Sequence, residues 1–271
     1  MNSEIYNMRI RSDVNLIFKK DILLSLRKNN FERWILMIYC ISDVHGDFIR
    51  YCTMLKMINF SDKDTLYVLG DVIDHGTESM KILFDMMNRA NVIPILGNHE
   101  YMARKCLPWF SKDIALKPFG EMSFKEFAMF KNWILNGGNA TLEEYRKLSI
   151  EKQKKVLDYI SGFSLYKEVS VGRKNFVLVH AGINNFDENK NMEDYQPHEL
   201  IFYRPDYSKV YFKDKYLVTG HTPTWLIRDK LEGVSLDLIY IHNKHIAIDC
   251  GCGYGGLLGA IRLDDFEDFY D

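Results

Sequence analysis

Five short motifs along the chain each place aspartate, asparagine or histidine next to or near a glycine. They are SDVHGD (42–47), GDVIDHG (70–76), GNHE (97–100), HAG (180–182) and GHT (220–222). Together they supply six side chains with oxygen or nitrogen donors: Asp43, His45, Asp71, Asn98, His180 and His221. A donor set of this kind, without cysteine, suits divalent ions such as Mn, Fe, Zn or Ni better than a thiolate-rich structural zinc site.

These donors outnumber what one ion needs. Six ligands fit two ions that share a carboxylate, and Asp71 is the expected bridge because it follows the second of two adjacent strands. Two ions about 3.5–4 Å apart stabilise both the attacking and the leaving oxygen of a phosphoryl displacement. A lone Asp-x-His or a lone histidine at a strand end is more often a hydrogen-bonded structural residue. Five such motifs in order, each after a strand, favour the metal site over that interpretation.

Apolar runs precede the motifs and predict the strands that position them. Expected strands cover 37–42, 65–70, 91–98, 174–182, 216–222, 245–251 and 257–263. Segments with helical periodicity follow the first three, at 48–59, 77–90 and 100–107. In an open α/β sheet the carboxyl ends of the strands face one crevice. We therefore expect an α/β fold in which motifs far apart in the sequence converge.

Residues 111–162 interrupt this alternation and predict a helical insert that covers one side. TLEEYRKL within it has a capping-box pattern at Thr141 and Glu144, and NGGNAT (136–141) is expected to be a loop. The first 36 residues are basic and mixed and carry no cleavable signal pattern. We treat 1–36 as an N-terminal appendage, which is not native if translation starts at Met37, and 37–271 as one domain with the insert.

Composition narrows the classes of partner and compartment. The chain has 271 residues and 47% hydrophobic residues, enough for a sizeable core, with a formal net charge of −2. That charge argues against nucleic-acid binding through bulk electrostatics. No apolar stretch reaches the length of a membrane span. Five cysteines, with Cys250 and Cys252 expected to be buried reduced thiols, indicate a reducing, cytoplasmic compartment. The sequence says nothing about the oligomeric state.

In this order the five motifs resemble those of the calcineurin-like metallophosphoesterases. More narrowly, they resemble the phosphoprotein phosphatase group, with its short bacterial and phage Ser/Thr phosphatases and symmetrical dinucleoside tetraphosphatases. IDCGCGYGG (248–256) is similar to the closing Asp-Thr-Gly strand of the family, and the resemblance runs from about residue 38 to 263. It implies a four-layer α-β-β-α sandwich, with two sheets packed face to face and helices outside.

The resemblance also implies a role for each residue. Asp43, His45 and the bridging Asp71 would hold the first metal, and Asp71, Asn98, His180 and His221 the second. Two divalent ions, manganese by expectation, would hold a bridging hydroxide as the nucleophile, so that no phosphoenzyme forms. His99 would be the general acid that protonates the leaving oxygen, and Asp74 would orient it. A carboxylate beside an imidazole fixes its tautomer and raises its pKa, which suits that role.

The chain departs from the family pattern at position 75, where the family has arginine. An arginine there would grip the substrate phosphate with a permanently charged fork. His75 is shorter and has fewer donors, so we expect Arg204, in LIFYRPDY, to carry most of the phosphate contact. His75 would assist when protonated, with affinity falling as the pH rises past about 7. The alternative is that His75 is a neutral hydrogen-bonding spacer.

Several substrates share such a centre. We expect a Ser/Thr protein phosphatase, which GNHE and NGGNAT favour. The alternative is a symmetrical dinucleoside polyphosphate hydrolase, which HAGI and the Gly-Tyr-Gly-Gly turn at 253–256 suggest. A phosphodiesterase or RNA-end phosphatase has no base-stacking platform to support it. A metal-binding regulator that has lost catalysis is the alternative of another class. Trp109, Phe110 and Trp133 could line a substrate cleft, although burial in the core is favoured for each.

Overall fold

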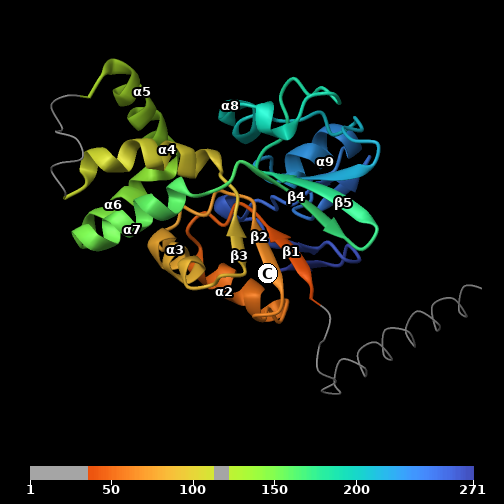
Figure 1. Cartoon of the computed structure of the whole chain (residues 1–271), viewed down its shortest axis with the longest axis horizontal. Helices are drawn as coiled ribbons and strands as arrows, with labels where there is room; N and C mark the ends of the chain where they lie inside the picture. The colour runs from red at the N-terminus through yellow and green to blue at the C-terminus, as the bar shows by residue number, and fades with distance from the viewer. Residues whose placement is uncertain (1–35, 113–121) are drawn as a thin grey trace, which may run out of the picture. The chain divides into compact units, whose positions relative to one another are not determined.

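The computed structural model describes residues 36–112 and 122–271, and the residues from Met37 onward form one compact unit (Figure 1). The predicted appendage at 1–36 lies, except for Leu36, outside the described residues. Two five-stranded sheets make up the centre of the compact unit, and helices flank them. This is the α/β class that the alternating apolar runs predicted.

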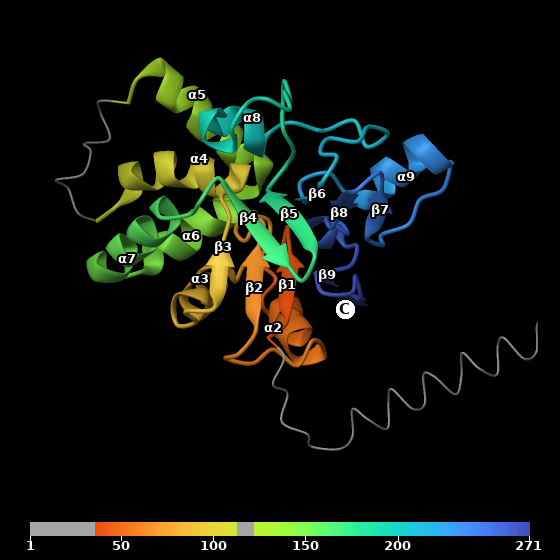
Figure 2. The same cartoon turned by 45° about the vertical axis from the view of Figure 1, so that its right-hand side comes forward.

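The first sheet contains the strands that end in the first three motifs. Its order is β10-β9-β1-β2-β3, and the strands are β1 (Ile38–Ile41), β2 (Thr65–Val68), β3 (Val92–Pro94), β9 (Gly259–Arg262) and β10 (Asp268–Tyr270). β1, β2 and β3 are parallel, and their arrowheads point the same way in Figure 2. Three motifs are thereby brought to a single edge of the sheet.

The second sheet holds the strands that end in the last two motifs. Its order is β4-β5-β6-β8-β7, and the strands are β4 (Tyr166–Val171), β5 (Lys174–Val179), β6 (Lys215–Thr219), β7 (Tyr240–His242) and β8 (His245–Ala247). β5, β6 and β8 are parallel, while β4 and β7 pair antiparallel at the two edges. The parallel core again places successive motifs at one edge.

Alternating side chains pack the two sheets together and against the helices. Cys40 of β1 and Phe176 and Leu178 of β5 lie in one buried cluster between the sheets. Val177 and Val179 alternate with Phe176 and Leu178 along β5 and therefore face the other side of the sheet. They lie in another cluster, with residues of α8. Because successive side chains of a strand point to opposite faces, each sheet is apolar on both faces and needs two covering layers. The result is the four-layer arrangement that the family resemblance implied.

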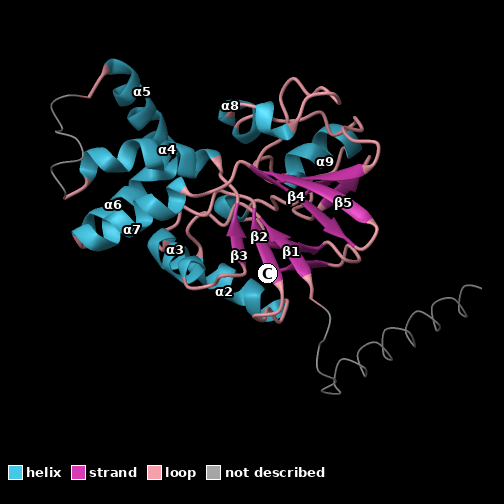
Figure 3. Cartoon of the chain, in the orientation of Figure 1, coloured by secondary structure: helices cyan, strands magenta, loops and turns pink. Residues whose placement is uncertain are grey.

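Helices cover the outer faces, as the cyan elements of Figure 3 show. Those associated with the first sheet are α2 (Phe48–Met57), α3 (Ser79–Met87), α4 (Asn98–Cys106) and the short η1 (Leu107–Phe110). Those associated with the second sheet are η4 (Met192–Asp194), α8 (Pro197–Ile201) and α9 (Thr224–Glu232). The short η5 (Cys252–Tyr254) lies instead with the first sheet, because Cys252 packs in the core cluster that contains β1 and β2. The three helices predicted after the first strands correspond to α2, α3 and α4. The sequence pattern did not indicate α8, α9, β4, β7 or β10.

Within 111–162 the described residues are mostly helical. They form α5 (Phe124–Trp133), η3 (Ile134–Gly138), α6 (Asn139–Lys147) and α7 (Ile150–Ser161), which we call the helical insert. The loop predicted at NGGNAT (136–141) is confirmed only at its start, where Asn136 and Gly137 leave helical geometry and Gly137 has φ 91°. Residues 139–141 belong to the first turn of α6 instead.

The predicted capping box at Thr141 and Glu144 is wrong, because α6 begins at Asn139 and Thr141 lies inside it. The two side chains bind elsewhere. The Glu144 carboxylate accepts hydrogen bonds from Ser79 N and Met80 N, at 2.9 and 3.1 Å, and so caps α3. A cap from a distant segment satisfies the same orphan N–H groups that a local cap would.

All five cysteines are free, and Cys250 and Cys252 are buried as expected. Across residues 36–112 and 122–271, no helix combines the length and the apolar character that crossing a bilayer would require.

Candidate metal centre

The loops that follow the strands carry unusual backbone geometry. Eleven non-glycine residues in the described part of the chain have positive φ. Six of them are predicted site residues: Asp43, His45, Asp71, Asp74, His75 and His221, with φ between 50° and 73°. Left-handed backbone costs an L-residue roughly 1–2 kcal/mol, and such strain gathers at functional sites. This strain lowers the stability of the folded protein, and the same backbone geometry directs these side chains toward the site.

Hydrogen bonds fix the first two loops against each other. Asp43 N donates to Gly70 O at 3.1 Å, and His45 N donates to Asp71 O at 2.9 Å. These bonds continue the β1–β2 ladder beyond the last strand residues. The first and second motifs therefore move as one unit.

Glu100 holds the second loop to the third. Its carboxylate accepts hydrogen bonds from Asp71 N, Val72 N, Ile73 N and Gly97 N, at 2.9, 2.7, 3.3 and 3.2 Å. Burial and the charge of Asp71 raise the pKa of Glu100 to about 7, whereas the backbone N–H groups favour its ionised form. Sequence reasoning gave this residue no role, although it stands in the GNHE motif. Its function is to organise the loops that bear the donors.

Asp71 lies at the centre of the site, as its predicted role as a bridge requires. Its Oδ2 lies 3.3 Å from His180 Nε2 and 3.8 Å from His99 Nε2, while Oδ1 accepts a hydrogen bond from His99 N at 3.1 Å. Burial alone would raise the pKa of Asp71, but His180 and His99 hold it well below its usual range. The carboxylate is therefore ionised and available to bind cations.

The other predicted ligands surround Asp71. The donor atoms of Asp43, His45 and Asp71 lie within 4.8 Å of one another, and those of Asp71, His180 and His221 do the same. Asn98 Oδ1 is 2.9 Å from His180 Nε2. All six predicted donors thus meet at the strand ends, although 178 positions separate Asp43 from His221.

The donor set fits divalent metal ions. His45 Nδ1 lies 3.2 Å from Ile73 O, and His180 Nδ1 lies 2.6 Å from Leu69 O. Hydrogen bonds from Nδ1 to those carbonyls leave Nε2 of each ring facing the other proposed ligands, which is how metal-binding histidines are usually oriented. Burial, together with the charge of Asp71, raises the pKa of Asp43 to about 6, against the opposing effect of His180. A cation between these carboxylates would relieve their repulsion.

His99 and Asp74 form a buried pair next to these donors. His99 Nδ1 lies 2.7 Å from Asp74 Oδ2, and Asp74 is fully buried. Burial lowers the pKa of His99, but the carboxylates of Asp71 and Asp74 outweigh it and raise the pKa to about 9. The imidazole therefore carries a proton at neutral pH, with Nε2 on the side of Asp71.

His75 and Arg204 are both exposed. The His75 ring is 4.7 Å from the ring of His45 and 5.5 Å from that of His99, between centroids. Burial and the charge of His99 lower the pKa of His75 below its usual 6.5. A protonated His75 would therefore belong to a lower pH range than the sequence led us to expect. Desolvation lowers the pKa of the half-buried His221 to about 3, and the positive charges of His180 and Arg204 act in the same direction.

Asp249 is a buried carboxylate in the closing motif IDCGCGYGG, and the sequence analysis gave it no role in the site. It is 3% exposed, and burial together with the charge of Asp43 raises its pKa well above the usual range. The sequence did indicate such a position, because Asp249 follows the strand segment HIAI just as Asp43 and Asp71 follow their strands. It adds another acidic group next to the proposed ligands.

Of the aromatic residues considered for a substrate cleft, Trp109 and Trp133 are buried, at 7% and 0% exposure, and Phe110 is half-buried. Burial was the favoured outcome. Trp133 nevertheless reaches the site, since its Nε1 donates to Asp74 Oδ2 at 2.7 Å.

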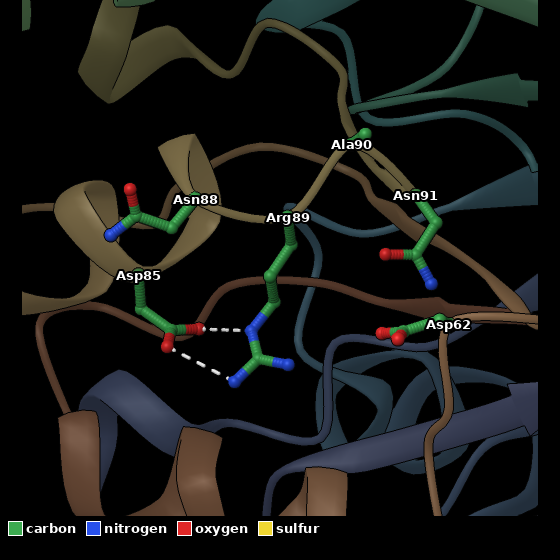
Figure 4. A pocket seen from close by; sticks show the side chains of 6 residues that line it. All are labelled: Asp62, Asp85, Asn88, Arg89, Ala90 and Asn91. Atoms are coloured by element: carbon green, nitrogen blue, oxygen red, sulfur yellow. Dashed lines mark hydrogen bonds and ion pairs between the residues drawn. The ribbon is translucent and has the colours of Figure 1, made fainter.

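A surface hollow of about 340 Å³ lies at the amino ends of β2 and β3, the opposite edge from the metal ligands (Figure 4). It is lined by Asp62, Asp85, Asn88, Arg89, Ala90 and Asn91. The Arg89 guanidinium is already paired with Asp85, at 2.7 and 3.1 Å. The residues that line the hollow therefore offer no unpaired positive charge that could bind a phosphate.

Comparison with known proteins agrees with this geometry. The family model of the calcineurin-like phosphoesterases matches residues 36–248. The asymmetrical bis(5'-nucleosyl)-tetraphosphatase PrpE of Geobacillus sp. is 24% identical over 258 residues, which cover 84% of this chain and 90% of that protein. The symmetrical bis(5'-nucleosyl)-tetraphosphatase of Buchnera aphidicola is 25% identical over 265 residues, which cover 86% and 96%. Serine/threonine-protein phosphatase 2 of Salmonella typhimurium is 40% identical over 67 residues, 24% of this chain and 30% of that protein.

Solved structures share the fold. A protein provisionally named a diadenosine tetraphosphatase superposes with a TM-score of 0.59 at 16% identity, covering 88% of this chain and 94% of that one. A protein serine/threonine phosphatase of Saccharomyces cerevisiae superposes with a TM-score of 0.53 at 14% identity, covering 89% and 81%. With the family model matching most of its length, the chain belongs to the calcineurin-like phosphoesterases and is a metal-dependent phosphoester hydrolase.

Proposed function

We propose that the strand-end site binds two divalent ions and hydrolyses a dinucleoside polyphosphate. The convergence of five other oxygen and nitrogen donors on Asp71 is the observation that carries the metal assignment. Asp43, His45 and Asp71 would hold one ion, and Asp71, Asn98, His180 and His221 the other. When bound, such ions polarise the phosphoryl oxygens and activate water at neutral pH. Manganese is the ion we expect, and iron, zinc and nickel suit the same donors.

His99 would supply the proton that the leaving oxygen needs. Its Nδ1 is engaged with Asp74 at 2.7 Å, so the proton to be transferred sits on Nε2, which faces the ligand cluster. A general acid positioned in this way contributes on the order of 10²–10⁴ in rate. Asp74 holds the ring in this tautomer and stabilises its charge.

Arg204 and His75 would contact the substrate phosphates from the open side of the site. Arg204 is exposed and acts electrostatically on His221, so its guanidinium can reach an anion that enters there. His75 offers a single ring donor at the place where the family has a guanidinium. We therefore expect weaker phosphate binding than in relatives with arginine at that position.

Tyr254 favours a nucleotide among the phosphoester substrates. Its ring is 67% exposed and lies 5.6 Å from the His75 ring, between centroids. An exposed aromatic ring at this distance from the phosphate site can stack on a base, which contributes about 1–3 kcal/mol in other proteins. Relatives that align over most of the chain are dinucleoside tetraphosphatases, which supports the same choice.

A Ser/Thr protein phosphatase, the first expectation from the sequence, is the second candidate. The 40% identity to the Salmonella phosphatase over 67 residues supports it. The exposed mouth of the site would also admit a phosphorylated side chain.

Hydrolysis assays with Mn²⁺ test the proposal directly. Diadenosine tetraphosphate and a phosphothreonine peptide would be compared, with Asp71→Asn as the inactive control. Cleavage of the dinucleotide is expected, and its products separate symmetrical cleavage (ADP) from asymmetrical cleavage (ATP and AMP). Phosphate release from the peptide alone would replace the dinucleotide assignment with the protein phosphatase. Inactivity on both, with two metal ions bound, would contradict both.

A further inference from the structure

Two hydrogen bonds from different parts of the chain converge on one oxygen of Asp74. His99 Nδ1 and Trp133 Nε1 each lie 2.7 Å from Asp74 Oδ2. The other oxygen, Oδ1, is buried and has no hydrogen-bond partner among the described residues. Rotation about the terminal torsion of an aspartate is only weakly restricted by its own geometry. The two donors therefore decide which way this carboxylate faces.

Trp133 is the last residue of α5, is fully buried and stands 59 positions from Asp74. The helical insert holds the backbone next to Asp74 as well. Thr141 Oγ1 accepts a hydrogen bond from Asp74 N at 2.9 Å, and Gly137 O accepts one from His75 N at 3.2 Å. Three contacts from α5, η3 and α6 thus bear on both the side chain and the backbone of this loop.

We propose that Trp133 is a positioning residue for the proton transfer by His99. Its indole N–H holds Asp74 Oδ2 in the orientation that bonds His99 Nδ1, and this keeps His99 Nε2 directed at the leaving oxygen. An indole is suited to this because it donates one hydrogen bond and adds no charge. A lysine or arginine in its place would pair with Asp74 and weaken the support that the carboxylate gives to the imidazolium. The proposal rests on the role of His99 in the proposed function.

Trp133 is also part of the hydrophobic core, so loss of the whole side chain would create a cavity. Trp133→Phe keeps an aromatic ring and removes the N–H. Trp109→Phe is the matched control, because Trp109 is a second buried tryptophan, in η1, and is 7% exposed. Thermal unfolding of both variants would establish that each remains folded.

The test compares two substrates that differ in their need for a general acid. With Mn²⁺ present, kcat would be measured for phenyl phosphate, whose leaving group is strongly basic, and for p-nitrophenyl phosphate, whose leaving group departs with little protonation. Trp133→Phe is expected to lower kcat for phenyl phosphate about ten-fold, with a much smaller loss for p-nitrophenyl phosphate and little change in KM. His99→Asn should show the same selectivity more strongly. Trp109→Phe should change the two substrates equally.

Equal losses on both substrates in Trp133→Phe, with His99→Asn remaining selective, would overturn the positioning role and leave the proposed function standing. A wild-type protein that hydrolyses no phosphoester would instead refute the proposed function.

A measurement that needs no activity then still decides the positioning role. The Nδ1–H signal of His99 in a ¹⁵N-labelled sample is expected to shift in Trp133→Phe and to stay in Trp109→Phe. An unchanged His99 signal in folded Trp133→Phe would overturn the inference.

Discussion

The strand-end loops and the helical insert meet at Asp74 and contribute different things to it. The loops bring charge and strained backbone, as at Asp71 and His45, whose φ values are 52° and 50°. The insert brings neutral hydrogen bonds from Trp133, Thr141 and the carbonyl of Gly137. In the proposed function the loops therefore bind the metal ions and carry the proton of His99. The helical insert orients one carboxylate, that of Asp74.

This division predicts different kinds of failure. A change in a loop ligand should remove metal, whereas a change in the acid or its supports should leave metal bound and slow the reaction. Asp71→Asn and His99→Asn separate these two outcomes. His75→Arg then tests the contact with the phosphate, and His245→Gln tests a buried histidine outside the site.

Asp71→Asn is expected to have the largest effect. Because Asp71 is the common neighbour of both donor groups, its neutralisation should lower kcat on the order of 10³-fold and reduce bound metal. Asp62→Asn, at the exposed hollow of Figure 4, is the control for loss of one carboxylate. Metal content by elemental analysis, measured with kcat, would show the effect. Full metal content in Asp71→Asn would contradict the bridging role.

His99→Asn should lower kcat roughly 10²–10⁴-fold while the metal content stays the same. In the proposed function the His99 ring donates a proton rather than binding a metal, and its Nδ1 is already engaged with Asp74. Elemental analysis and steady-state kinetics on the same preparation would test this. If the variant lost a metal ion as well as activity, His99 would be a metal ligand, and the division between metal binding and proton transfer would not hold.

His75→Arg should lower KM for a phosphoester about five-fold, with a smaller change in kcat. A guanidinium makes charge-assisted hydrogen bonds with phosphate. We assign about 1 kcal/mol of binding free energy to them because the side chain at position 75 is exposed, and this corresponds to the five-fold change in KM. His75→Gln, which keeps a neutral donor, serves as the control and should leave KM nearly unchanged. An arginine variant with the wild-type KM would mean that position 75 does not touch the phosphate.

His245 lies in the second sheet away from the ligands and should make stability, rather than activity, depend on pH. It is 1% exposed, its Nε2 is 2.9 Å from Thr219 Oγ1, and its ring stacks on Tyr207 at 4.5 Å. Burial lowers its pKa from 6.5 to about 3. Between these values the unfolded chain binds a proton that the folded protein does not, so stability falls as the pH drops below 6.5.

The expected loss is at most about 1.4 kcal/mol per pH unit over that interval. It would be measured as the difference in urea unfolding free energy between pH 7 and pH 5, for wild type and His245→Gln. The glutamine variant should lose less stability than wild type. Equal losses in the two proteins would show that His245 does not contribute.

The contrast with His99 explains why two buried histidines behave in opposite ways. His99 has Asp71 and Asp74 beside it, and its pKa is raised to about 9. His245 has a hydroxyl and aromatic rings, and its pKa is lowered. Burial acts on both in the same direction, and only the neighbouring carboxylates reverse its effect.

The sequence by itself determined the α/β class, most strands of both sheets and the motifs that carry the six proposed donors. These features are local, because an apolar run and the polar residues that end it are adjacent in the chain. Parallel pairing then brings the strand ends to one edge whatever the distance between them in sequence.

Only the tertiary structure decided which residues of the insert reach the site. Thr141 and Glu144 looked like a local helix cap, but packing against α3 gave both of them distant backbone partners. Trp133 looked like a core residue and is one, yet its single polar atom meets Asp74. Such contacts depend on how a helix docks, and no periodicity within the helix records it. The same holds for His75, whose pKa follows from the charge of His99 and partial burial rather than from its own type.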